Sequence, residues 1–195
     1  MNGGVVVVHA WWGLNDDVNA YAERLRRQGY ATATPDLYAG RVATTIEGAE
    51  ALRDQMDPQH AMAEVAAALT DLSRRADRVA VLGWSLGVWY GWRLAQLRAT
   101  EIQAVVSYYG LGEVDAKAQL PPLLGHYAEQ DDFEALADVR RTEQQLVTAG
   151  RIAEFHVYRN TRHWFDEPSR PEFDRDASAL AFSRTLTFLE THLRR

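Results

Sequence analysis

The chain has 195 residues, of which 47% are hydrophobic and 25% charged, a composition typical of a globular protein with a sizeable core. The net charge of −6 and the lack of any run of Lys or Arg argue against a nucleic-acid partner. Because the sequence contains no cysteine, disulfides, thiolate metal sites and cysteine nucleophiles are excluded.

The first apolar run, residues 5–8, has no basic leader before it and contains only four consecutive valines. We therefore expect no signal peptide, no membrane span and a cytoplasmic location. The valines instead predict a strand that is buried on both faces of a parallel sheet.

An amphipathic helix is expected next, with apolar residues three and four positions apart from Val18 to Leu25. Asp16 or Asp17 is expected to cap its start, and Gly29 is suited to its end. Beyond it, the sequence predicts a strand at residues 30–34 and helices at 45–56 and 58–75.

The remainder of the chain continues this alternation. Further strands are predicted at residues 79–82, 102–108, 123–127 and 153–158, and helices at 86–98, 133–150 and up to Leu193. Residues 111–122 and 160–170 are expected to be loops. Because no linker, repeat or low-complexity tract interrupts the pattern, we predict a single α/β domain over residues 1–195, with three layers and one mostly parallel sheet flanked by helices.

The segment that joins the third strand to its helix, Gly83-Trp84-Ser85-Leu86-Gly87, fits the nucleophile-elbow pattern G-x-S-x-G. Such a turn is strained and lifts the Ser85 hydroxyl clear of the sheet, with glycines at 83 and 87 because side chains there would collide with the neighbouring strand and helix. The backbone N–H of Leu86 would then bind an oxyanion. The same five residues also fit an ordinary strand-to-helix turn, so a base and an acid must come from elsewhere.

The candidate base is His163, which lies between the last strand and the last helix. In chains with a nucleophile elbow the catalytic residues follow one another in the order Ser, acid, His, and this order puts the histidine near the end of the chain. Asp131 and Asp132 both qualify as the acid. Asp131 is preferred because it comes first, whereas Asp132 makes a natural cap for a helix at Phe133. His9 is a plausible pocket residue. The other histidines are interpreted as structural or surface residues: His60, His126, His156 and His192.

A second oxyanion donor is expected from the loop after the first strand, as the N–H of Trp11. Four tryptophans fall on the predicted site loops and could wall a small apolar pocket, although any one of them could simply cover the sheet end: Trp11, Trp12, Trp84 and Trp164. No metal-ligand pair, P-loop or dinucleotide fingerprint is present, so we predict no metal and no cofactor.

Several of these motifs together resemble the dienelactone hydrolase family of small α/β-hydrolases. Residues 9–15 (HAWWGLN) resemble its first-strand loop, 28–38 its Q-G-Y-A and P-D-L-Y stretch, 107–110 its Y-Y-G turn, and 130–131 with 161–165 its acid and histidine motifs. The resemblance covers nearly the whole chain. It implies an α/β-hydrolase fold, a triad of Ser85, Asp131 and His163, and an oxyanion hole formed by the N–H groups of Leu86 and Trp11.

The sequence departs from the family pattern in ways that bear on the site. Ser85 stands where the family usually has cysteine, and Ala10, counted here as a pocket residue, stands where it has a glutamate associated with control of that thiol. Asp166 and Glu167 follow His163 where the family has an arginine nearby, so carboxylated substrates are expected to be repelled. The chain also starts at a strand that the family reaches later, so we expect the sheet to be trimmed at that edge.

These observations predict a serine hydrolase that cleaves a small, uncharged ester or lactone through an acyl-enzyme on Ser85. A thioesterase or another acyl hydrolase with the same triad remains open. A catalytically silent α/β-hydrolase that binds small molecules also remains open.

Overall fold

The computed structural model describes residues 3–113, 115 and 117–194, and this part of the chain contains six strands and six helices. The strands are β1 (Gly4–Val8), β2 (Ala31–Ala33), β3 (Val79–Trp84), β4 (Ile102–Tyr108), β5 (Leu123–Gln130) and β6 (Ala153–Arg162). The helices are α1 (Asp16–Arg27), α2 (Ile46–Gln55), α3 (Pro58–Ser73), α4 (Leu86–Leu97), α5 (Leu136–Thr148) and α6 (Arg175–Leu193). Strands and helices alternate along this part of the chain except where α2 is followed by α3 and β4 by β5.

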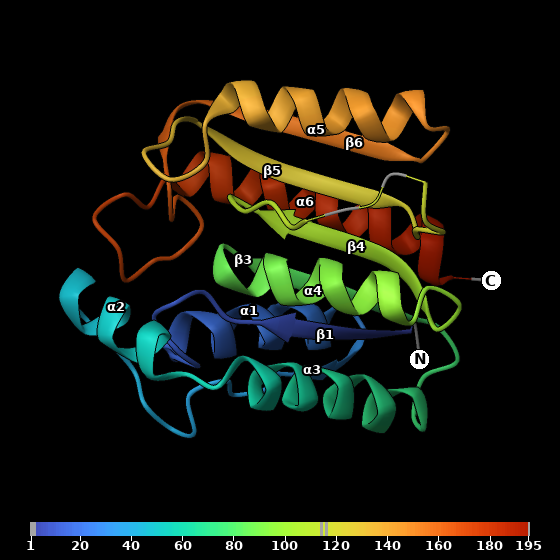
Figure 1. Ribbon diagram of the computed structural model, residues 1–195, viewed down its shortest axis with the longest axis horizontal. Helices are drawn as coiled ribbons and strands as arrows, with labels where there is room; N and C mark the ends of the chain where they lie inside the picture. Colours follow the sequence, from blue (N-terminus) through green and yellow to red (C-terminus); the bar gives the residue numbers. More distant parts are fainter. Residues whose placement is uncertain (1–2, 114, 116, 195) are drawn as a thin grey trace.

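The strands form one sheet in the order β2-β1-β3-β4-β5-β6, and every neighbouring pair is parallel. The carboxyl ends of the strands therefore meet at one edge of the sheet, on the left of Figure 1, where α2 and the segment before α6 also lie. In parallel sheets this edge is where ligands bind, so the fold fixes where a site can be built.

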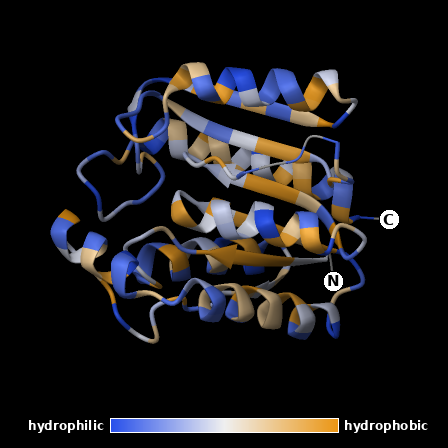
Figure 2. Ribbon diagram, in the orientation of Figure 1, coloured by the Kyte–Doolittle hydropathy of each residue, from blue (hydrophilic) through white to orange (hydrophobic). Residues whose placement is uncertain are grey.

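The valines of β1 show why the sheet is covered on both faces. Val5 and Val7 belong to a core cluster that includes side chains of α1 and α6, whereas Val6 and Val8 belong to a cluster with α3 and α4. Figure 1 shows α3 and α4 in front of the sheet and α1 and α6 behind it, and Figure 2 shows β1 as an apolar strand between helices of mixed hydropathy. The predicted three-layer α/β architecture with a parallel sheet is confirmed. None of the described helices is long and apolar enough to cross a membrane.

The ends of several elements differ from the prediction. Asn15, and not Asp16 or Asp17, caps α1, because its side chain accepts the Val18 N–H at 3.1 Å. The strands β5 and β6 run on past residues 127 and 158, and the two stay paired as far as Gln130 and Arg162 across a bulge. These extensions consist mostly of polar, exposed residues, which give no hydrophobic signal in the sequence.

Candidate active site

Ser85 occupies a strained turn between β3 and α4. Its φ of 47° and ψ of −112° are unusual for a non-glycine residue, and its side chain makes no capping hydrogen bond to the helix. A Cβ on Gly83 would come within 2.5 Å of the Gly87 backbone, and one on Gly87 would come within 2.7 Å of the His9 carbonyl oxygen and closer still to that of Val8. The predicted need for glycine at both positions is confirmed, and the turn leaves the serine hydroxyl free to bond elsewhere.

The structure brings Ser85, His163 and Asp131 into one hydrogen-bonded series. His163 Nε2 lies 2.9 Å from Ser85 Oγ, and His163 Nδ1 lies 2.9 and 2.8 Å from the two carboxylate oxygens of Asp131. Because a carboxylate only accepts, Nδ1 carries the proton and Nε2 is left to accept from the serine. The His163 and Asp131 side chains are almost wholly buried, so this series is shielded from bulk water.

Asp131, and not Asp132, is the carboxylate that contacts the histidine. Asp131 Oδ1 also accepts the backbone N–H groups of Phe133 and Glu134, at 2.8 and 2.9 Å. The expected capping role of Asp132 is therefore wrong: Asp131 closes this turn, and α5 begins later, at Leu136. Two backbone donors and one imidazole donor fix the orientation of the Asp131 carboxylate.

The two predicted oxyanion donors lie in segments that pack together. Leu86 is the first residue of α4, so its N–H has no partner within the helix. Trp11 lies in the turn after β1. The carbonyls of Val8 and His9, just before that turn, lie against Gly87 on the first turn of α4. The role of the Leu86 and Trp11 N–H groups in binding an oxyanion stays a prediction.

Three of the four predicted pocket tryptophans gather beside the histidine. Trp11, Trp12 and Trp164 pack on one another with ring centroids 5.1 to 5.9 Å apart, and the Trp164 and His163 ring centroids are 5.0 Å apart. Trp164 also has a positive φ of 66°, a second strained backbone position next to the site. This cluster forms an aromatic wall on one side of the imidazole.

Other predicted pocket residues lie elsewhere. The assignment of Trp84 to the pocket is wrong: its ring packs on Tyr21 and Tyr108 in the core, and its indole N–H donates to Asp166 at 3.2 Å. Ala10 is almost fully buried, and its carbonyl accepts from Gly13 N and from a ring nitrogen of His9. Both residues contribute packing, because their side chains point into the core.

His9 is a structural residue and not the plausible pocket residue expected from the sequence. It is fully buried, and its Nε2 accepts the backbone N–H of Leu37 at 3.0 Å while Nδ1 donates to the Ala10 carbonyl at 2.6 Å. Burial lowers the pKa of His9, which favours the neutral imidazole that can accept and donate in this way. His9 thus links the loop after β1 to the segment after β2 through its hydrogen bond with Leu37.

Asp166 and Glu167 do not face a substrate, contrary to expectation. Both are buried: Asp166 accepts from the Ser178 hydroxyl at 2.6 Å, and Glu167 accepts from the Tyr109 hydroxyl at 2.9 Å. Burial raises the pKa of Asp166 to about 7 and that of Glu167 to about 8. The expected repulsion of carboxylated substrates by these two groups therefore has no structural basis.

Two residues that the sequence reasoning missed also contact the histidine. The ring centroid of Tyr109 lies 5.0 Å from that of His163, and that of Phe133 lies 4.8 Å from it. Tyr109 is fully buried, whereas Phe133 is about half exposed at the rim of the aromatic wall. Their positions directly after β4 and two residues after the acid, both at strand ends, are the signal that could have identified them.

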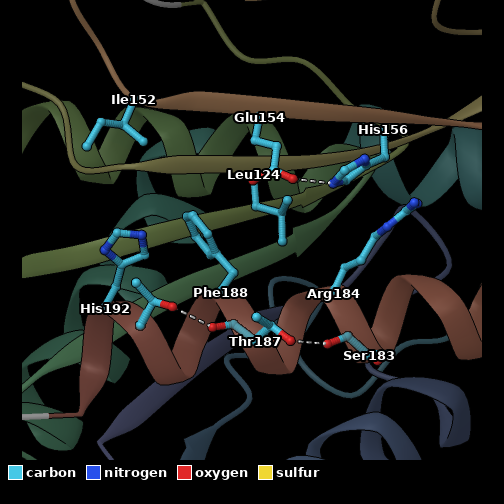
Figure 3. Close-up of a pocket in the computed structure, with 10 residues that line it drawn as sticks. Leu124, Ile152, Glu154, His156, Ser183, Arg184, Thr187, Phe188 and His192 are labelled. Atoms are coloured by element: carbon cyan, nitrogen blue, oxygen red, sulfur yellow. Dashed lines mark hydrogen bonds and ion pairs between the residues drawn. The ribbon is translucent and has the colours of Figure 1, made fainter.

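A separate hollow of about 290 Å³ lies between β6 and α6, towards the amino ends of β5 and β6 (Figure 3). Glu154 and His156, whose Oε1 and Nε2 atoms are 2.8 Å apart, line it together with Arg184 and His192. Ser85, Asp131 and His163 are not among the residues that line it. Among the residues that the structure describes, no three His, Asp or Glu side chains are grouped so that they could hold a metal ion.

Comparison with known proteins places the chain among hydrolases. The sequence model of the dienelactone hydrolase family matches residues 2–193. A carboxymethylenebutenolidase of Pseudomonas putida is 28% identical over 95% of this chain and 84% of its own length. A Bradyrhizobium protein named as a probable 2-oxo-3-(5-oxofuran-2-ylidene)propanoate lactonase is 27% identical over 97% of this chain and 84% of its own length.

The fold is shared with solved structures of similar size. A dienelactone hydrolase-type structure from Klebsiella pneumoniae subsp. pneumoniae superposes with a TM-score of 0.84 at 22% identity, covering 96% of this chain and 86% of that one. This likeness shows the α/β-hydrolase fold. With the family match over almost the entire sequence, it follows that the chain belongs to the dienelactone hydrolase family of the α/β-hydrolase superfamily.

Proposed function

We propose that this protein is a serine hydrolase that opens small lactones or cleaves small esters through an acyl-enzyme on Ser85. The observation that carries the proposal is the continuous hydrogen-bond series from Asp131 through His163 to Ser85, at 2.8 and 2.9 Å. A nucleophile within reach of a base that a third group orients is the arrangement that activates a hydroxyl for acyl transfer.

In the first half-reaction, Ser85 Oγ attacks the carbonyl carbon of the substrate while His163 Nε2 takes its proton. The Asp131 carboxylate accepts from Nδ1 and stabilises the imidazolium without taking the proton itself. The N–H groups of Leu86 and Trp11 would hold the negative charge on the carbonyl oxygen. The bond to the leaving oxygen then breaks, and His163 returns the proton to that oxygen.

In the second half-reaction, His163 takes a proton from water, and the resulting hydroxide attacks the acyl carbon. The Ser85 oxygen leaves and recovers the proton from the imidazolium, so the enzyme is restored and the product is a carboxylic acid. When the substrate is a lactone, the leaving hydroxyl stays attached to the same product molecule.

The lining of the site favours an apolar, partly planar substrate. Phe133 and Trp164 pack on His163, and Trp11 packs on both of them, so the imidazole is flanked by aromatic rings, which bind flat or apolar groups well. The names of two relatives, a lactonase and a carboxymethylenebutenolidase, support a lactone as the substrate class.

Covalent labelling with a fluorophosphonate, followed by hydrolysis assays with p-nitrophenyl acetate and the aromatic lactone dihydrocoumarin, tests the proposal. We expect the native protein to be labelled, Ser85→Ala to be unlabelled, and hydrolysis by Ser85→Ala to fall by at least about 10³-fold. Ser183→Ala is the matched control, because Ser183 lines the hollow of Figure 3 and does not contact His163. Labelling or undiminished hydrolysis in Ser85→Ala would overturn the assignment.

A further inference from the structure

Glu167 is a buried carboxyl group that the proposed mechanism does not use. It lies four residues after His163, is 1% exposed, and accepts the Tyr109 hydroxyl at 2.9 Å. Its backbone N–H donates to the Trp164 carbonyl at 3.0 Å, which closes a turn directly after the histidine. A carboxyl group is costly to bury, so we asked what this one does for the site.

Tyr109 connects this carboxyl group to the catalytic histidine. Its backbone has a positive φ of 37° and donates its N–H to the His126 carbonyl at 2.7 Å. Its ring packs against the His163 imidazole, with centroids 5.0 Å apart and planes tilted by 59°. The next residue, Gly110, packs so closely on Ser85 that there is no space for a side chain: a Cβ at this position would lie 2.7 Å from the Ser85 carbonyl oxygen. Tyr109 is therefore fixed at its backbone by β5 and at its hydroxyl by Glu167.

Tyr109 is the most firmly held of the three rings that pack on His163. Phe133 is about half exposed, and the indole N–H of Trp164 is buried without a hydrogen-bond partner. Tyr109, by contrast, is fully buried and bonded at both ends. A ring fixed in this way limits how far the imidazole can tilt out of the line between Asp131 and Ser85.

We propose that Glu167 is a positioning residue that acts through Tyr109 to hold the His163 imidazole in place after Ser85 has been acylated. The inference rests on the proposed function. In the free enzyme the imidazole has hydrogen-bonding partners at both ring nitrogens, Ser85 and Asp131. Once Ser85 Oγ carries the acyl group it has no proton to donate, so the imidazole keeps only its bond to Asp131. Packing against a fixed Tyr109 then decides whether Nε2 still points at the water that must be activated.

The proposal predicts that the two half-reactions respond differently to loss of the Glu167–Tyr109 hydrogen bond. Tyr109→Phe removes the hydroxyl and keeps the ring, and Glu167→Leu removes the acceptor. In both variants we expect the deacylation rate with p-nitrophenyl acetate to fall about tenfold, while the rate of fluorophosphonate labelling changes less than about twofold. Stopped-flow measurement should show a burst of p-nitrophenolate whose amplitude approaches the enzyme concentration.

A conservative change at Glu167 tests whether the loss of deacylation comes from the position of His163 or from a less stable fold. Glu167→Gln keeps an oxygen that can accept from Tyr109, so its deacylation rate should stay within about twofold of the native rate. Adding Glu167→Leu to Tyr109→Phe should cause no further loss, because both changes break the same bond. Tyr108→Phe is the matched control: its hydroxyl bonds to Tyr21 and Thr185, so its loss should reduce stability and leave deacylation unchanged.

The outcomes distinguish the inference from the proposed function. If Ser85 cannot be labelled in the native protein, the hydrolase proposal fails. If Ser85 is labelled and turns over, but Tyr109→Phe deacylates at the native rate, only the inference fails. Equal losses in Tyr108→Phe and Tyr109→Phe, or equal losses in both half-reactions, would also overturn it.

Discussion

At the scale of single residues, the orientation of the Asp131 carboxylate decides which proton His163 carries. In Asp131→Asn, the amide oxygen would stay with the Phe133 and Glu134 N–H groups, and the amide NH₂ would face His163 Nδ1. This arrangement favours the tautomer protonated on Nε2, which cannot accept the serine proton. We expect Asp131→Asn to lower kcat by about 10⁴-fold and Asp132→Asn by less than about twofold. Steady-state hydrolysis of p-nitrophenyl acetate measures both, and equal losses would contradict this assignment of the acid.

The buried carboxyl groups make stability depend on pH in an unusual direction. Burial, helped by the charges of Asp17 and Asp166 and opposed by the Tyr109 hydroxyl and Arg170, raises the pKa of Glu167 from its ordinary value of 4.5 to about 8. The folded state therefore holds this proton more tightly than the unfolded chain. The stabilisation of the folded state by the proton on Glu167 is complete below about pH 4 and is lost as the pH rises towards 8.

The contribution of Glu167 to the free energy of unfolding should accordingly fall between pH 5 and pH 9. The difference in free energy of unfolding between the native protein and Glu167→Gln, which has no proton to lose there, should therefore shift against the native protein as the pH rises. Urea unfolding at pH 5, 7 and 9 measures the slopes. Glu50→Gln, at an exposed position on α2, is the control and should keep the native slope. If the free energy of unfolding changes with pH by the same amount in the native protein and in Glu167→Gln, Glu167 does not contribute to this pH dependence.

At the scale of elements, the contact between the first turn of α4 and the end of β1 sets the position of Ser85. In Gly87→Ala, the new methyl group would meet the backbone carbonyls of Val8 and His9, which cannot move aside as side chains can. We expect a loss of about 1 to 3 kcal/mol of stability and slower labelling of Ser85.

Gly91→Ala, one turn further along α4, is the matched control for this prediction. Its methyl group would lie 3.1 Å from a methyl group of Val81, a side chain that can adjust. Alanine is also more favourable than glycine in a helix interior by about 1 kcal/mol, so the stability of Gly91→Ala should be equal to or greater than that of the native protein. Thermal unfolding and fluorophosphonate labelling measure both variants. Identical behaviour of the two alanine variants would show that the α4–β1 contact does not control the elbow.

The elements also show how much the sequence could predict. The strand interiors, the helices and the elbow were predictable because buried runs, helical spacing and glycines are local signals. The polar ends of β5 and β6 were not, because only pairing between the two strands keeps them extended. Trp84, Asp166 and Glu167 were misplaced for a related reason. The directions of their side chains depend on partners distant in sequence, such as Tyr21 and Tyr109.

At the scale of the whole molecule, the site combines three segments that are distant along the chain. His163 bonds to Ser85, 78 residues earlier, and to Asp131, 32 residues earlier, and each segment follows a different strand of the sheet. The order of these residues was predictable because parallel strands bring their carboxyl ends together at one edge. Their distances were not, because they depend on the register of β3, β4, β5 and β6.

The position of β6 at the edge of the sheet has a consequence for how activity is lost on heating. Among the strands that the structure describes, β6 pairs with β5 alone, and His163 follows directly after β6. Edge elements open in local fluctuations at lower free energy than the centre of a sheet does. Ser85 follows directly after β3 in the middle of the sheet, so partial opening of β6 would move the proposed base, His163, away while the proposed nucleophile, Ser85, keeps its position. The hydrolase would then become inactive, reversibly, while most of its sheet is still folded.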